Sequence, residues 1–216
     1  MSGINRAGAA AFVAAPLLAL AGALVVPTLS DEAPDRVAAL LAHRGAETGG
    51  LTLQMIALGL MVAGSVWLAL AVAPRAPRLA VAGGVLAVFA YFVIAFENGV
   101  ALAAAGIVPA LEPSQAVTAL HAVEESAGVA AVEPLSIAEV IGYSLLAVGL
   151  RRTASPLWAG ALLVAASAVQ TAGFATGTAA LVVAGFAGVA LAALGIVRAL
   201  AGRPAAAPAP QPATAP

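Results

Sequence analysis

The sequence that decides the fold is Leu79–Phe96, LAVAGGVLAVFAYFVIAF, which contains eighteen apolar or small residues and no charge. An uncharged run of this length predicts a transmembrane helix. The run begins after Arg78 and ends at Glu97-Asn98-Gly99. At about 1.5 Å per residue, Glu97 lies about 28 Å from Arg78 along the helix, near the far edge of a hydrocarbon layer about 30 Å thick. A carboxylate at the end of such a helix is unusual, and it directs attention to the polar residues at the same depth.

The composition of the whole chain points to a membrane protein. Of 216 residues, 62% are hydrophobic and 9% are charged, and the mean hydropathy is +1.05. Soluble domains are about 45–50% apolar and about 25% charged. At about 20 residues per helix plus loops, this length accommodates five to seven spans.

The absence of two residue types excludes several kinds of chemistry. The chain has no cysteine, which excludes disulfides, thiolate metal sites, covalent haem attachment and cysteine nucleophiles. It has no lysine, since all nine cations are arginine, which excludes Schiff-base and Walker-type phosphate chemistry. No cofactor is predicted. A net charge of −1 leaves no basic surface for nucleic acid, so no nucleic-acid partner is predicted. The predicted surroundings are membrane lipid.

The apolar runs divide the chain into an all-α bundle of six transmembrane helices within residues 1–203. The first run follows a short cationic start, and we expect it to be a span and not a cleaved signal peptide. The third extends past Phe96 because Val100–Val108 stays apolar. The predicted spans are residues 7–30, 51–73, 79–105, 135–150, 157–175 and 178–197.

Three further features complete the predicted organisation. Arg36–His43 has helical periodicity and predicts a short interfacial helix, and a second is predicted from Ser114, as N-cap, to Ser126. A glycine allows a tight turn at Ala175-Thr-Gly177-Thr. Residues 204–216, almost all alanine and proline, predict a disordered tail.

The distribution of arginine predicts the orientation. With six spans, two arginines fall on one side and seven on the other, which are Arg6, Arg75, Arg78, Arg151, Arg152, Arg198 and Arg203. Short arginine-rich loops stay in the cytoplasm, so both termini are predicted to be cytoplasmic and the acidic loops external. Five or seven spans would lose this separation. The expected location is a bacterial plasma membrane.

Four of the predicted spans carry a carboxyl or amide group at a similar depth in the outer leaflet. These candidate ligand- or proton-binding residues are Gln54, Glu97, Asn98, Glu139 and Gln170, with Tyr143 one helical turn from Glu139. An ionised carboxylate that faces lipid costs a few kcal/mol, so these groups are expected to face one another or water. The hypothesis is an outer polar pocket. The alternative is that they only hydrogen-bond neighbouring helices or lie among headgroups.

A metal site is the weakest candidate. His121, Glu124 and Glu125 have the spacing to present an imidazole and a carboxylate to one ion. Catalytic metal sites use about three protein ligands and structural sites about four. The only other histidine, His43, belongs to a different segment. A solvated acidic helix explains the same pattern.

One hairpin carries a resemblance. Residues 141–152, IGYSLLAVGLRR, and 155–163, SPLWAGALL, form an aliphatic helix with a glycine and an aromatic, a basic turn, and a Pro-x-x-x-Gly start to the next helix. This pattern resembles a family of six-span bacterial membrane proteins of unknown function, and the lysine-free composition looks actinobacterial. The resemblance covers mainly the fourth to sixth spans. It implies the same six-helix architecture and no catalytic residue.

Three functions are compatible with these patterns. The first is a non-enzymatic membrane protein. It would be an accessory subunit, assembled with a partner membrane protein or with copies of itself, or it would bind a lipid or small apolar molecule in the outer pocket. The second is a proton- or cation-coupled transporter of a small solute that uses Glu139 and Glu97. The third is an externally facing metal-dependent enzyme that uses His121 and its neighbouring acids.

Overall fold

A computed structural model describes residues 3–26, 32–153 and 155–201. The described chain is helical throughout, with no strand, and six of its helices are long and apolar enough to cross a membrane. This confirms the predicted all-α six-helix bundle of a multi-pass membrane protein. The predicted tail at 204–216 lies outside the described residues.

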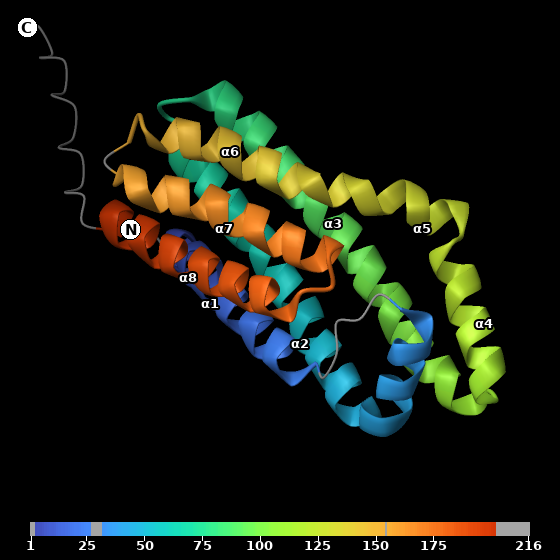
Figure 1. The fold of residues 1–216 in the computed structure, drawn as a ribbon. Coiled ribbons are helices and arrows are strands. Elements are labelled where there is room, and N and C mark those ends of the chain that lie inside the picture. The colour runs from blue at the N-terminus through green and yellow to red at the C-terminus, as the bar shows by residue number, and fades with distance from the viewer. Residues whose placement is uncertain (1–2, 27–31, 154, 202–216) are drawn as a thin grey trace, which may run out of the picture.

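Each predicted span corresponds to one helix of the bundle, although α2 begins 18 residues before the predicted start of the second span. They are α1 (Gly3–Val25), α2 (Ala33–Val72), α3 (Pro77–Ile107), α6 (Ala138–Leu150), α7 (Leu157–Ala175) and α8 (Ala179–Ala201). Each packs against the next, and α8 also packs against α1, so the six form a closed ring around a common core. Figure 1 shows the antiparallel arrangement, with the start of α1, the α2–α3 turn, the α6–α7 connection and the end of α8 at one end.

This end is referred to below as the basic end. The elements there contain every described arginine except two: Arg6, Arg75, Arg78, Arg151, Arg152 and Arg198. The other end, the acidic end, holds the first turns of α2 and the short elements η1 (Val108–Ala110), α4 (Pro113–Glu124), α5 (Ala127–Val132) and η2 (Glu133–Ile137). The segregation of charge follows from the alternating direction of the helices.

The acidic end has a small core of its own. The first turns of α2 pack on the end of α3, on η1 and on α4 through the side chains of Ala33, Val37, Leu40, Ala105, Val108, Ala116 and Leu120. An ion pair between Arg36 and Glu124 joins α2 to α4. The predicted interfacial helices therefore exist, and they pack on one another. The N-cap of α4 is Glu112, with Pro113 in the first turn, and not Ser114 as predicted.

The linker expected between the first interfacial helix and the second span is helical. The backbone bends only at His43, where φ is −133° and ψ is 33°, and the helix continues from there to Val72. The reason is packing, because the carbonyl oxygen of Gly22 in α1 lies only 2.8 Å from where a Cβ on Gly50 would sit. The close approach buries Gly50 and keeps this stretch of α2 against α1. At the other predicted turn, Gly177 has a φ of 59°, as expected of a glycine turn.

Small residues bring the helices together, as glycine and alanine do in membrane bundles. Four glycines contact a neighbouring helix in this way: Gly83 and Gly84 in α3, and Gly185 and Gly188 in α8. The closest approach is between α3 and α6. A Cβ on Gly142 would lie 2.6 Å from the backbone nitrogen of Ala87 and 2.8 Å from the carbonyl oxygen of Gly83.

We expect Gly142→Ala to destabilise the bundle by about 1–3 kcal/mol, because the new methyl group meets backbone atoms that cannot rotate away. Unfolding in a mixed-micelle denaturant titration measures the change. Gly59→Ala is the matched control, since no atom lies within 4 Å of its Cβ position. Equal losses in the two variants would contradict the packing argument.

Candidate functional site: a buried carboxyl on a hydroxyl chain

The best-defined polar site in the bundle is a chain of four side chains from three helices. Glu139 in α6 is 1% exposed. The hydroxyl group of Tyr91 in α3 donates to its Oε1 over 3.2 Å. The Tyr91 hydroxyl also lies 2.5 Å from that of Tyr143 in α6, and the Tyr143 hydroxyl lies 3.2 Å from Oγ of Ser65 in α2. The chain therefore connects α6, α3 and α2 through hydrogen bonds.

The order of the donors follows from the chemistry of the groups. Each hydroxyl has one proton to donate, and a carboxylate can only accept. If Tyr91 donates to Glu139, then Tyr143 donates to Tyr91 and Ser65 donates to Tyr143. If Glu139 is protonated and donates a hydrogen bond to Tyr91, donor and acceptor exchange roles in every hydrogen bond of the chain. The state of the carboxyl group in α6 is thus linked to the orientation of a hydroxyl group in α2.

The close contact between α3 and α6 explains how the chain forms. Gly142 precedes Tyr143, and Ala87 lies one helical turn before Tyr91. Because the two backbones touch at Gly142 and Ala87, the hydroxyl groups of the two long side chains meet in the interior instead of passing each other. The rings of Tyr91 and Tyr143 contact edge to face, with centroids 6.4 Å apart. Both tyrosines are fully buried.

The chain crosses the middle of the membrane. Measured from the basic end at about 1.5 Å per residue, Tyr91 lies about 21 Å from Pro77, Glu139 about 18 Å from Arg151, and Ser65 about 12 Å from Ala73. The midplane of a 30 Å hydrocarbon layer is at about 15 Å. Glu139 and Tyr91 therefore lie in the half nearer the acidic end, and Ser65 lies just past the middle.

On the side of the hydroxyl chain toward the basic end, α2 and α6 contribute buried apolar side chains. The buried side chains there include Leu68 and Val72 from α2 and Leu146 and Leu150 from α6, each 2% exposed or less. None of these side chains carries a hydrogen-bonding group. The polar chain is thus closed toward the basic end, and Glu139 itself is occluded from solvent.

The remaining predicted residues lie in two other contacts. The amide group of Asn98 in α3 donates to Oε1 of Gln54 in α2 over 3.5 Å, and Gln54 packs beside Gly22 of α1. Glu97, next to Asn98, is half-buried. The structure therefore joins Gln54 to Asn98, and Glu139 to Tyr143, but no hydrogen bond between described residues joins these two pairs.

Gln170 is at a third contact. It is 4% exposed and packs on Gly185, where α7 and α8 touch. Its Oε1 has no hydrogen-bond partner among the described residues, and neither has Oγ of Ser167, one turn earlier on the same helix. Ser167 and Gln170 therefore share the buried face of α7. The predicted groups are thus divided among three interhelical contacts, and these contacts give no support to a single shared pocket.

The described residues give the metal candidate no support. Within the described ranges, no three His, Asp or Glu side chains are grouped so that they could hold a metal ion. Glu124 pairs with Arg36, and Nε2 of His121 lies 3.5 Å from a carboxylate oxygen of Glu125, with both of these side chains mostly exposed. The arginine occupies the carboxylate that a metal would need. The acids of α4 therefore connect α4 to α2 or face solvent.

Comparison with known proteins adds no assignment. No protein family, curated protein or solved structure matches the chain.

Sequence reasoning missed two members of the hydroxyl chain, Tyr91 and Ser65. A signal for each was present. Tyr91 carries the only hydrogen-bonding side chain in Leu79–Phe96, and Ser65 has the only hydroxyl in the second half of its span. An isolated hydroxyl in an otherwise apolar span seeks a partner on a neighbouring helix. Its partner could not be identified without knowing which helices are neighbours.

Proposed function

We propose that this protein is a proton-coupled transporter of a small solute, with Glu139 as its proton-binding group. One observation carries the proposal: a carboxyl group that is 1% exposed lies inside a membrane bundle, bonded to a hydroxyl chain that crosses the midplane. Ionisable residues inside membrane bundles are costly and typically serve proton or ion pathways.

The surroundings of Glu139 support a coupling between proton binding and conformation. Its hydrogen-bond partner is a hydroxyl group, and among the described residues no arginine pairs with it. A charged carboxylate without a cation or water is expensive in an apolar interior. Release of a proton from Glu139 therefore requires that water or a cationic solute reach the site, which means that the helices around it must open.

The position of the site supports access from the acidic end. Glu139 is in the first turn of α6, near the acidic end, whereas Leu146, Leu150 and their neighbours fill the interior between Glu139 and the basic end. We propose that the basic end faces the cytoplasm of a bacterial cell, by the usual bias of arginine in short loops. Proton entry would then be from outside. An accessory or ligand-binding role, expected first from the sequence, stays a prediction.

Proton movement into vesicles tests the proposal. The purified protein is reconstituted in liposomes that contain a pH-sensitive dye, with the membrane potential clamped by potassium and valinomycin, and an acid pulse is applied. We expect wild-type protein to carry protons and Glu139→Gln to lose all protein-dependent flux. Glu125→Gln, which changes an exposed acid at the C-cap of α4, is the matched control and should behave as wild type. Flux in Glu139→Gln equal to wild type, or wild-type flux no faster than empty liposomes, would refute the proposal.

A further inference from the structure

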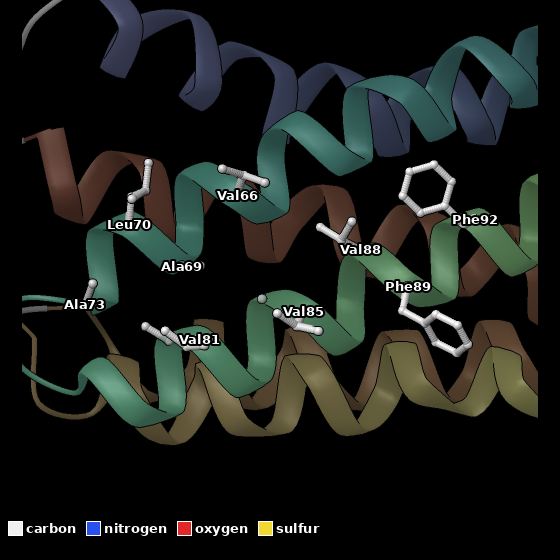
Figure 2. A pocket seen from close by; sticks show the side chains of 11 residues that line it. Val66, Ala69, Leu70, Ala73, Val81, Val85, Val88, Phe89 and Phe92 are labelled. Carbon is white, nitrogen blue, oxygen red and sulfur yellow. The ribbon is translucent and has the colours of Figure 1, made fainter.

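An apolar groove lies on the outside of the bundle, between α2 and α3, away from the hydroxyl chain. Its volume is about 560 Å³. Figure 2 shows Val66 and Leu70 on α2 and Val85, Val88 and Phe89 on α3, with the ring of Phe89 turned away from α2. The other lining residues are Ala69, Ala73, Ala80, Val81, Gly84 and Phe92. None has a charged or hydrogen-bonding side chain, so the groove fits a hydrocarbon chain.

The groove is about as long as one membrane leaflet is thick, and it begins near the basic end. It extends along α3 from Val81 to Phe92, which is about 16 Å at 1.5 Å per residue. Half of a 30 Å hydrocarbon layer is about 15 Å. The two helices α2 and α3 are in contact, since a Cβ on Gly84 would lie 2.8 Å from that of Ala69. Phe92 lies about 22 Å from Pro77 along α3, so an acyl chain that enters at the basic end and follows the whole groove would pass the midplane.

The end of the groove near the basic end has a positive charge. Ala73 lies two residues before Arg75, and Val81 lies one helical turn after Arg78. Both arginines are exposed. No aspartate or glutamate occurs in the chain between Glu47 and Glu97, so no acid in either helix near this turn neutralises them. An anionic headgroup placed at the turn would meet two cations at the depth where the groove begins.

We infer that the groove between α2 and α3 binds a phospholipid with an anionic headgroup, with an acyl chain along Val81–Phe92 and its phosphate at Arg75 and Arg78. The inference is independent of proton coupling at Glu139. An arginine near an anionic membrane surface contributes about 1 kcal/mol, which corresponds to about fivefold in binding. Loss of both arginines is therefore expected to remove most of the preference for anionic over zwitterionic lipid.

The test compares two lipids with matched chains. The full-length protein is reconstituted in vesicles of equimolar phosphatidylglycerol and phosphatidylcholine, extracted gently, and its co-purifying lipids are quantified by mass spectrometry. We expect phosphatidylglycerol to be enriched at least about fivefold on the wild type. Arg75→Gln/Arg78→Gln should lower the ratio to near one. Arg151→Gln/Arg152→Gln, which removes two exposed arginines from another turn of the same end, should keep it.

A second pair of variants tests the groove itself. Val85→Trp fills the groove from a position that is 63% exposed, and it should reduce the amount of both lipids. Leu191→Trp, on the exposed surface of α8, is the matched control and should not. Equal amounts of the two lipids on the wild type, or an unchanged ratio in Arg75→Gln/Arg78→Gln, would overturn the inference. A Val85→Cys variant that forms a disulfide-linked dimer in the membrane would also overturn it, because a second copy would then occupy the groove.

Discussion

Replacement of Glu139 by glutamine is expected to remove one carboxyl band from the infrared spectrum of the protein in lipid vesicles, with no other carboxyl affected. Glu139 is the most deeply buried acid among the described side chains and accepts its hydrogen bond from Tyr91, whereas acids such as Glu125 lie in water. A carboxyl group that is shielded from water absorbs at a different infrared frequency from solvated carboxyl groups. A difference spectrum between two pH values, recorded for wild type and Glu139→Gln, isolates its signal.

Tyr91→Phe provides the specific control for this band. It keeps the carboxyl group and the ring and removes only the hydroxyl that bonds to Oε1. We expect the band to shift and not to disappear, because the carboxyl group loses a partner but stays buried. Glu124→Gln should leave the band unchanged, since that side chain pairs with Arg36 outside the bundle core. A spectrum of Glu139→Gln identical to wild type would show that Glu139 does not change protonation under these conditions.

The fold was largely predictable from the sequence because lipid imposes a strong length requirement. The run without charge from Leu157 to Ala175 was predicted to the residue, since Pro156 precedes it and the glycine turn follows it. The boundaries failed where polar residues occur in a helix that packs on another helix. Residues 44–50 look like a loop in the sequence, yet the contact of Gly50 with Gly22 keeps them helical.

The site was predictable only in part. Glu139 and Tyr143 were identified because a carboxyl and a hydroxyl one turn apart share a helical face. The partners on other helices were not, because depth along a helix can be counted from the sequence but rotation about its axis cannot. Gln170 has nearly the same depth as Glu139, but it faces Gly185. Equal depth was therefore a poor guide to proximity, whereas the contact of Gly142 with α3 determined which hydroxyls meet.

Tyr91 is expected to be the most costly hydroxyl of the chain to remove. It bonds to both Glu139 and Tyr143, whereas Ser65 bonds only to the end of the chain. Tyr91→Phe leaves a buried carboxyl without its donor, and an unsatisfied buried polar group costs about 1–3 kcal/mol. Ser65→Ala removes one interhelical bond, which is worth about 0.6 kcal/mol in membrane bundles. Unfolding in a mixed-micelle denaturant titration should rank the two variants in this order.

A double-mutant cycle separates the hydrogen bond from packing. Glu139→Leu removes the carboxyl, and in that background the hydroxyl of Tyr91 loses one partner but keeps Tyr143. The double variant Tyr91→Phe/Glu139→Leu should therefore be more stable than the sum of the single losses predicts, with a coupling of about 0.5–3 kcal/mol, as found for residues in one network. Strict additivity would mean that the two side chains are merely adjacent. In that case the chain would not transmit the protonation state of α6 to α2, and the link that the proposed function requires would be absent.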